Sequence, residues 1–141
     1  MMVLVDTPIW SLALRRQPSA LSAGEQLLVR SLRELIAESR VQILGATRQE
    51  ILSGIRERAQ FLRIRSQLRA FEDVSLTAND YEEAAAMSNT CRRSGIAASP
   101  IDMLICASGQ RRSWQVFSTD HDFVHYRRVL PIQLIPISRF Q

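Results

Sequence analysis

Short runs of apolar residues are the clearest pattern along this chain. They occupy residues 3–5, 41–45, 116–118 and 132–135, with another candidate at 73–76. The first run ends at Asp6-Thr7-Pro8, and the last is bounded by Pro131 and Pro136. Runs this short, bounded by turn-forming residues, are typical of buried β-strands. The sequence therefore predicts a sheet of four or five strands.

Helical periodicity fills the segments between these runs. Residues 22–38 carry apolar side chains at helical spacing, namely Leu27, Leu28, Leu32, Leu35 and Ile36. Further helices are predicted at 47–55, 57–70, 78–93 and 100–109, and the turn at Asp6 leads into another.

The alternation of strands and helices favours an α/β fold. Such an order is typical of a mostly parallel sheet with helices on both faces. The chain has 141 residues, 46% of them hydrophobic, and no repeat or linker divides it. These numbers suit one compact unit, so we expect a single domain spanning residues 1–141.

Carboxylates follow the predicted strands. Asp6 comes directly after the first strand, Glu50 lies one helical turn beyond the second, and Asp120 and Asp122 follow the strand at 116–118. Asp102 lies in the first turn of the most apolar helix. Ligands of parallel sheets bind beyond the carboxyl ends of the strands, so these acids are expected to meet at one edge. Clustered carboxylates repel one another unless a cation neutralises them, and hard oxygen ligands suit Mg²⁺ or Mn²⁺.

Helix capping is an alternative explanation for the same acids. Residues 99–102, 47–50 and 119–122 each fit the capping-box pattern, in which a Ser or Thr precedes an acid by three positions. Residues 22–25 and 77–80 fit it too, without a comparable argument for chemistry. Asp102 is the acid that capping explains least well by itself, because its apolar neighbours predict burial, and a buried carboxylate needs a partner or a metal.

The basic side chains are all arginine. Eighteen basic residues against fourteen acidic ones give a formal charge of +4, and the sequence contains no lysine. Arginine binds phosphate with two parallel hydrogen bonds, which favours nucleic-acid contact over mere solubilising charge. The absence of lysine excludes P-loop enzymes, phosphorylated receiver domains and Schiff-base enzymes.

The remaining composition indicates a cytoplasmic protein. Cys91 and Cys106 are too few and too far apart for a disulfide scaffold or a zinc site, so both are expected to be free thiols. No apolar run approaches membrane-spanning length, and the N-terminus resembles a strand rather than a signal peptide.

Four segments together resemble the PIN-domain ribonucleases, in particular the VapC-type toxins of bacterial toxin–antitoxin pairs. These segments are residues 3–7, residues 50–54, residues 95–107 with Asp102 inside them, and residues 117–123. They occur in the family's order and spacing over essentially the whole chain. Ser118 stands where the family more often has threonine, and Cys106 stands where alanine is common.

This resemblance implies a three-layer α/β/α fold and cleavage of RNA that depends on a divalent metal. Asp6, Glu50, Asp102 and Asp120 match the family's acidic quartet, and Asp122 matches a further acid that is often present. We assign Asp6, Asp102, Asp120 and Asp122 to metal binding and Glu50 to orienting the nucleophile. The resemblance also implies a homodimer and inhibition by a cognate antitoxin.

Several alternatives remain at this point. The chain could be a noncatalytic RNA-binding or regulatory module, a metal-dependent phosphatase or a DNA nuclease. A haloacid-dehalogenase-type phosphatase would require an Asp at Pro8 and a lysine. His121 and His125 could form a zinc pair, although no third ligand is evident. The basic face of helix 57–70 could contact RNA, an acidic antitoxin or only solvent.

Overall fold

Four parallel strands form the centre of the molecule. The structure is a computed structural model and describes residues 1–137. The sheet has the order β2-β1-β3-β4, with bounds β1 Val3–Val5, β2 Val41–Gln42, β3 Gln115–Phe117 and β4 Gln133–Leu134. β1 pairs in parallel with β2 and β3, and β3 with β4. The predicted strand at 73–76 is wrong, because that segment makes a single bridge between Asp73 and Ile43.

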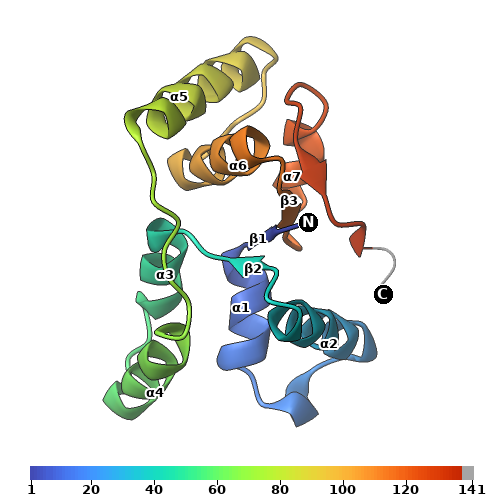
Figure 1. Cartoon of the computed structure of the whole chain (residues 1–141). Helices are drawn as coiled ribbons and strands as arrows, with labels where there is room; N and C mark the ends of the chain where they lie inside the picture. Colours follow the sequence, from blue (N-terminus) through green and yellow to red (C-terminus); the bar gives the residue numbers. More distant parts are fainter. Residues whose placement is uncertain (138–141) are drawn as a thin grey trace.

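Helices cover both faces of this sheet, which confirms the predicted α/β/α layering (Figure 1). On one side lie α1 (Thr7–Leu14) and α2 (Ala23–Ala37), with the short 3₁₀ helix Pro18–Ala20 between them. On the other side lie α5 (Ala78–Arg93) and α6 (Pro100–Arg112). α3 (Gly45–Leu52) and α4 (Arg58–Leu68) form a pair beside β2, and α7 (Asp122–Tyr126) follows β3.

Alternation along the strands divides the core into two apolar clusters. Val3 and Val5 face the cluster under α1 and α2, whereas Leu4 between them faces the cluster under α5 and α6. Along β3, Val116 and Phe117 separate in the same way. Successive side chains of a strand point to opposite faces, so a strand that is covered on both sides reads as a continuous apolar run.

The other predicted elements differ from the structure only at their ends, whereas α7 was not predicted. The predicted helix 100–109 continues to Arg112, and the predicted helix 47–55 begins at Gly45 and ends at Leu52. Both cysteines are buried free thiols, as predicted. Among the described residues, no helix has the length and apolar character needed to cross a membrane.

Candidate metal centre

Asp6 lies where the ends of β1 and β3 meet. Its backbone N–H donates to the carbonyl oxygen of Phe117 at 2.9 Å, which continues the parallel pairing by one residue. Ser118, the residue after β3, donates its hydroxyl to Oδ2 of Asp6 at 2.8 Å. The Asp6 side chain therefore points toward the carboxyl edge of the sheet, and only 4% of the residue is exposed.

Burial makes Asp6 an unusual carboxylate. Desolvation raises the pKa of Asp6 from 3.8 to about 6, while the hydrogen bonds from Ser118 and the Thr7 backbone oppose this effect. The nearby charges of Asp102 and Glu50 raise it further. Asp6 is thus held in a place where the anion is disfavoured unless a cation compensates it.

This arrangement predicts a pH-dependent stability in the absence of metal. The pKa of Asp6 is higher in the folded than in the unfolded chain, so the folded state binds the proton more tightly. The stability that this proton contributes is therefore lost as pH rises from about 4 to above about 6. The loss should be on the order of 2–3 kcal/mol. This part of the loss should be absent in Asp6→Asn, whose stability should therefore fall less over the same range. Urea unfolding of both proteins in EDTA across this pH range measures their free energies of unfolding. Free energies that change in parallel with pH in the two proteins would contradict the raised pKa of Asp6.

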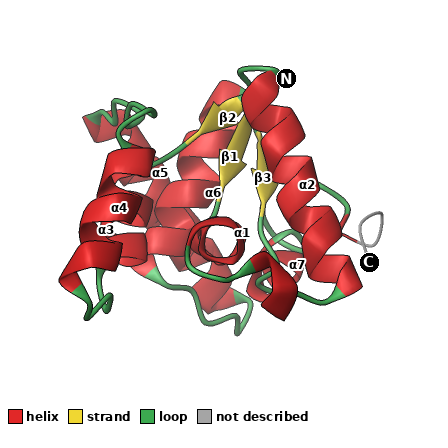
Figure 2. Cartoon of the chain, turned by 90° about the horizontal axis from the view of Figure 1, so that it is seen from below, coloured by secondary structure: helices red, strands yellow, loops and turns green. Residues whose placement is uncertain are grey.

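Three further carboxylates form a compact group beside this edge. One oxygen from each of Asp102, Asp120 and Asp122 lies within 4.8 Å of the others. Asp102 comes from the first turn of α6, Asp120 from the loop after β3, and Asp122 from the start of α7. In Figure 2 the arrowheads of β1 and β3 point toward α1 and α7, which lie beyond the carboxyl ends of the strands.

Backbone hydrogen bonds fix the loop that carries two of these acids. The N–H of Asp120 donates to Oγ of Ser118 at 3.0 Å, and the N–H of Asp122 donates to Oδ1 of Asp120 at 2.9 Å. Ser118 therefore connects Asp6 with Asp120. Burial raises the pKa of Asp102, and the charges of Asp120 and Asp122 act in the same direction. The group is consequently one of mutually repelling carboxylates, which a divalent cation would stabilise.

Glu50 lies apart from this group. It is exposed on α3 and accepts a hydrogen bond from the hydroxyl of Thr7, the first residue of α1. Its charge acts on Asp6, as noted above. The structure thus brings Asp102, Asp120 and Asp122 together. Asp6 and Glu50 lie outside this group, and the charges of Asp102 and Glu50 both act on Asp6.

Two of the three proposed capping boxes at these acids do not form. α3 begins at Gly45 with Leu44 as N-cap, so Thr47 is inside the helix and buried, and its hydroxyl lacks a hydrogen-bond partner among the described residues. α7 has His121 as N-cap, without a side-chain cap. The complete boxes are those at residues 22–25 and 77–80, which lie away from the strand ends. The predicted capping boxes therefore do not explain Glu50, Asp120 or Asp122.

Ser99 does cap α6, but its box remains half formed. The Ser99 hydroxyl oxygen accepts from the N–H of Asp102 at 3.1 Å. The Asp102 carboxylate, however, accepts from the hydroxyl of Tyr126 at 2.6 Å instead of completing the box on the Ser99 backbone. Tyr126 was not among the predicted site residues. Its place depends on α7, a helix of five residues that has too short a periodic pattern to be predicted from sequence.

The two histidines and the basic face of α4 are the other candidate binding features of the sequence. His121 and His125 contact each other edge to face, with ring centroids 5.2 Å apart. The one group of three potential metal ligands among the described residues contains neither histidine. On α4, Arg58 and Arg63 are exposed and form no ion pair within residues 1–137, so this basic face is available to a ligand.

A groove of about 750 Å³ opens beside the acidic residues. Pro8 and Thr119, the neighbours of Thr7 and Asp120 in the chain, line one part of it, and Gln60 on α4 lines another. Arg15 and Arg16, at the end of α1, also line the groove. Glu25 of α2 lines the groove as well, so its charged side chains are two arginines and one carboxylate.

Comparisons with known proteins support the fold. The sequence matches the family described as PIN domain over residues 3–129. The structure of FitAcB from Neisseria gonorrhoeae superposes with a TM-score of 0.76 at 19% identity, covering 97% of this chain and 99% of that one. VapBC2 from Rickettsia felis, bound to a DNA fragment from its promoter, gives 0.72 at 13% identity, covering 96% and 98%. A toxin–antitoxin complex from Klebsiella pneumoniae gives 0.69 at 17% identity, covering 96% and 97%. No curated protein sequence matches the chain.

Proposed function

The chain belongs to the PIN domain family, and we propose that it is a metal-dependent ribonuclease that hydrolyses RNA phosphodiester bonds. One observation carries the proposal: three carboxylate oxygens within 4.8 Å of one another, next to the nearly buried Asp6. Among residues 1–137, no cationic side chain forms an ion pair with these carboxylates or with Asp6. Every arginine ion pair among residues 1–137 involves a different acid, namely Glu38, Asp73 or Asp80.

The donor set fits Mg²⁺ or Mn²⁺. All candidate ligands are carboxylate oxygens, which hard cations prefer, and the site offers neither a thiolate nor a histidine in the group. We propose that Asp102, Asp120 and Asp122 hold the metal, with Asp6 at its border. When bound, a divalent cation makes water a stronger nucleophile and neutralises charge on the phosphate.

The side chains around this group orient it. Ser118 holds Asp6 through its hydroxyl and accepts from the backbone of Asp120, so one serine sets the relative position of two acids. Thr7 holds Glu50 in a similar way. Because Glu50 is exposed and still has oxygens free for further hydrogen bonds, it is suited to orient the attacking water.

The groove lined by Arg15 and Arg16 is suited to bind the part of an RNA strand that extends beyond the acidic group. Arg15 and Arg16 are exposed, and neither forms an ion pair within the described residues. Arg15→Ala/Arg16→Ala should weaken binding of single-stranded RNA several-fold and lower the slope of log affinity against log salt by roughly 1 to 2. Fluorescence anisotropy in EDTA measures both quantities without cleavage.

A charge-matched variant controls for this effect. Arg92→Ala/Arg93→Ala removes the same charge from the end of α5, outside the groove, and should leave the salt slope near that of the wild type. Equal losses in the two double variants would mean that RNA responds only to net charge and not to this groove.

We also propose that the protein is the toxin of a type II toxin–antitoxin pair, with a cognate antitoxin as partner and a homodimer as its assembly. The support is the fold shared with solved toxin–antitoxin proteins. Expression of this chain alone should arrest growth, and the small protein of the adjoining reading frame should restore it. Growth that is unaffected by the folded protein would contradict the toxin role.

Light scattering of the purified protein measures its oligomeric state, and a monomer would contradict the proposed homodimer.

The substrate and the chemistry can be tested together. Purified protein is incubated with an RNA and a DNA of the same sequence, with Mn²⁺ or with EDTA. The proposal predicts cleavage of the RNA with Mn²⁺ only. Preferential cleavage of DNA would instead favour a DNA nuclease, and tight RNA binding without cleavage would favour the noncatalytic module.

A further inference from the structure

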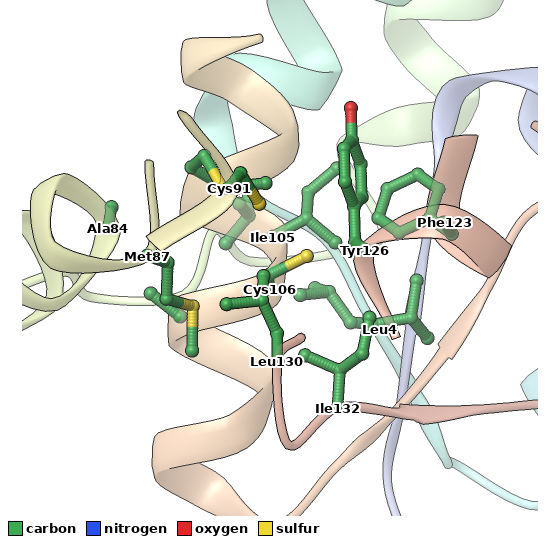
Figure 3. Close-up of a cluster of buried hydrophobic side chains, with 14 residues drawn as sticks. Leu4, Ala84, Met87, Cys91, Ile105, Cys106, Phe123, Tyr126, Leu130 and Ile132 are labelled. Carbon is green, nitrogen blue, oxygen red and sulfur yellow. The ribbon is translucent and has the colours of Figure 1, made fainter. Parts of the chain in front are cut away.

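Tyr126 joins the apolar core to the acidic group. Only 1% of the residue is exposed, and its ring packs edge to face against Phe123 with centroids 5.3 Å apart. Both residues belong to the core cluster that also contains Leu4 and Cys106. In Figure 3 the ring lies among these side chains while the hydroxyl points away from them. That hydroxyl donates to Oδ2 of Asp102 at 2.6 Å.

We propose that Tyr126 is a positioning residue, which holds Asp102 in the orientation that binds the metal. The bond is short and its acceptor is a carboxylate, which makes it one of the stronger hydrogen bonds available to a side chain. It occupies one position on Oδ2 and fixes the rotation of the carboxylate, while other lone pairs remain for a cation. Ligating carboxylates depend on such outer partners for their orientation.

The same residue also sets the distance between two elements. Asp122 and Tyr126 are four positions apart on α7, so they lie on the same side of the helix. The bond from Tyr126 to Asp102 therefore holds α7 against the first turn of α6. This contact keeps Asp122 and Asp102 in one group, although α7 has only five residues and little intrinsic stability.

The inference rests on the proposed function in one respect, because it takes Asp102 to be a metal ligand. Its test therefore uses metal binding as well as cleavage. Tyr126→Phe keeps the ring and its packing and removes only the hydroxyl. Tyr81→Phe removes the hydroxyl of the only other tyrosine, which is 55% exposed on α5.

Titration of the metal-free proteins with Mn²⁺, with free Mn²⁺ followed by electron paramagnetic resonance, gives the first result. Tyr126→Phe should bind Mn²⁺ about 10-fold more weakly than the wild type and lose RNA cleavage to a similar extent. Tyr81→Phe should match the wild type in both. A Tyr126→Phe protein with unchanged Mn²⁺ affinity would overturn the positioning role while leaving the proposed function intact. A wild type that binds no Mn²⁺ would overturn both.

A double-mutant cycle separates positioning from a general packing effect. If Tyr126 acts through Asp102, Tyr126→Phe should change Mn²⁺ affinity by less than about twofold in an Asp102→Ala background, which removes the acceptor of the Tyr126 hydroxyl. A second loss of about 10-fold in that background would mean that Tyr126 supports the site by another route, and would overturn the inference.

Discussion

Replacing Asp102 with asparagine is expected to lower Mn²⁺-dependent RNA cleavage by more than about 100-fold, because loss of an outer partner of a metal ligand already costs 10- to 100-fold. Asparagine keeps the shape of the side chain and can still accept the bond from Tyr126. It removes one negative charge from the group with Asp120 and Asp122. The measurement is the initial rate of cleavage of a labelled single-stranded RNA at saturating Mn²⁺.

The fold should survive this substitution. Burial raises the pKa of Asp102, so the charged form is disfavoured in the folded protein, and a neutral side chain should not destabilise it. Urea unfolding in EDTA should therefore give a free energy of unfolding equal to or above that of the wild type. Glu82→Gln, which removes an exposed charge on α5, serves as the control and should cleave normally. Cleavage by Asp102→Asn at the wild-type rate would contradict its role as a ligand.

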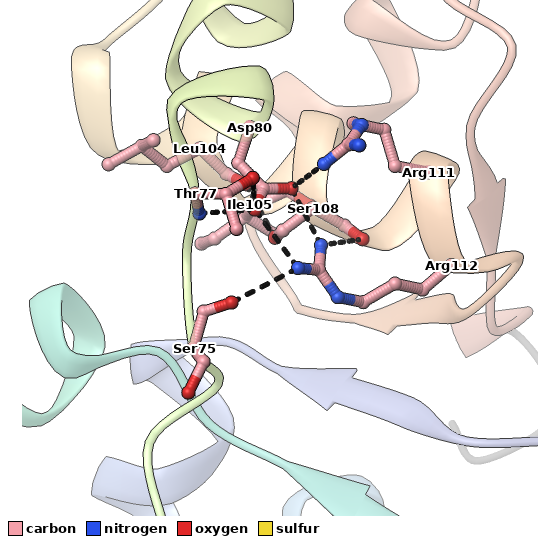
Figure 4. Close-up of polar contacts among 8 residues, drawn as sticks. All are labelled: Ser75, Thr77, Asp80, Leu104, Ile105, Ser108, Arg111 and Arg112. Atoms are coloured by element: carbon pink, nitrogen blue, oxygen red, sulfur yellow. Dashed lines mark hydrogen bonds and ion pairs between the residues drawn. The ribbon is translucent and has the colours of Figure 1, made fainter.

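Asp80→Ala is expected to destabilise the protein by about 3 kcal/mol, because it leaves a pair of arginines without their buried partner. Asp80 is fully buried. It accepts from Arg111 at 2.7 Å and from Arg112 at 2.7 and 2.9 Å, as Figure 4 shows. Its carboxylate also accepts from the N–H of Thr77, the N-cap of α5, at 2.9 Å. The cost is moderated because the two arginine side chains are 32% and 22% exposed and retain some water.

The pH dependence of this contribution is opposite to that of Asp6. The hydrogen bond from Arg112 is the main reason why the pKa of Asp80 lies well below 3.8. The stabilisation is therefore fully present above the unfolded-state pKa and is lost as pH falls through the lower folded-state value. Urea unfolding at neutral pH, with Glu82→Gln as a control within about 0.5 kcal/mol of the wild type, measures the effect. A comparable change in both variants would contradict the structural role of Asp80.

Asp80 and Asp102 show that the same capping signature in the sequence can belong to two different structural roles. Residues 77–80 and 99–102 carry the same capping signature, yet one acid closes its box and pairs with arginines while the other is held by Tyr126. The difference comes from tertiary partners 24 or more residues away in the chain. Strand position was the better guide, because Asp6 and Asp120 follow directly from the parallel order of β1 and β3.

The parts that sequence did not predict have physical reasons. Residues 73–76 alternate as a strand would, but their pairing stops at one bridge between Asp73 and Ile43, in which the N–H of Val74 donates to the carbonyl oxygen of Ile43. Asp122 joins Asp102 and Asp120 because α7, which begins at this residue, brings it there. Glu50 is exposed on α3 and lies outside that group. Tyr126 lacks any local signal, since its role exists only once α6 and α7 have packed.

The central claim is that the acidic group cleaves RNA by means of a divalent cation, and a Mn²⁺ titration of cleavage tests it most directly. Wild-type protein freed of metal is mixed with one single-stranded RNA, and the initial rate is measured as Mn²⁺ is added, beside the variant Asp120→Asn. The account predicts no cleavage in EDTA, a rate that saturates with Mn²⁺, and a loss of more than about 100-fold in the variant. Cleavage that persists in EDTA, or an Asp120→Asn protein as active as the wild type, would contradict it.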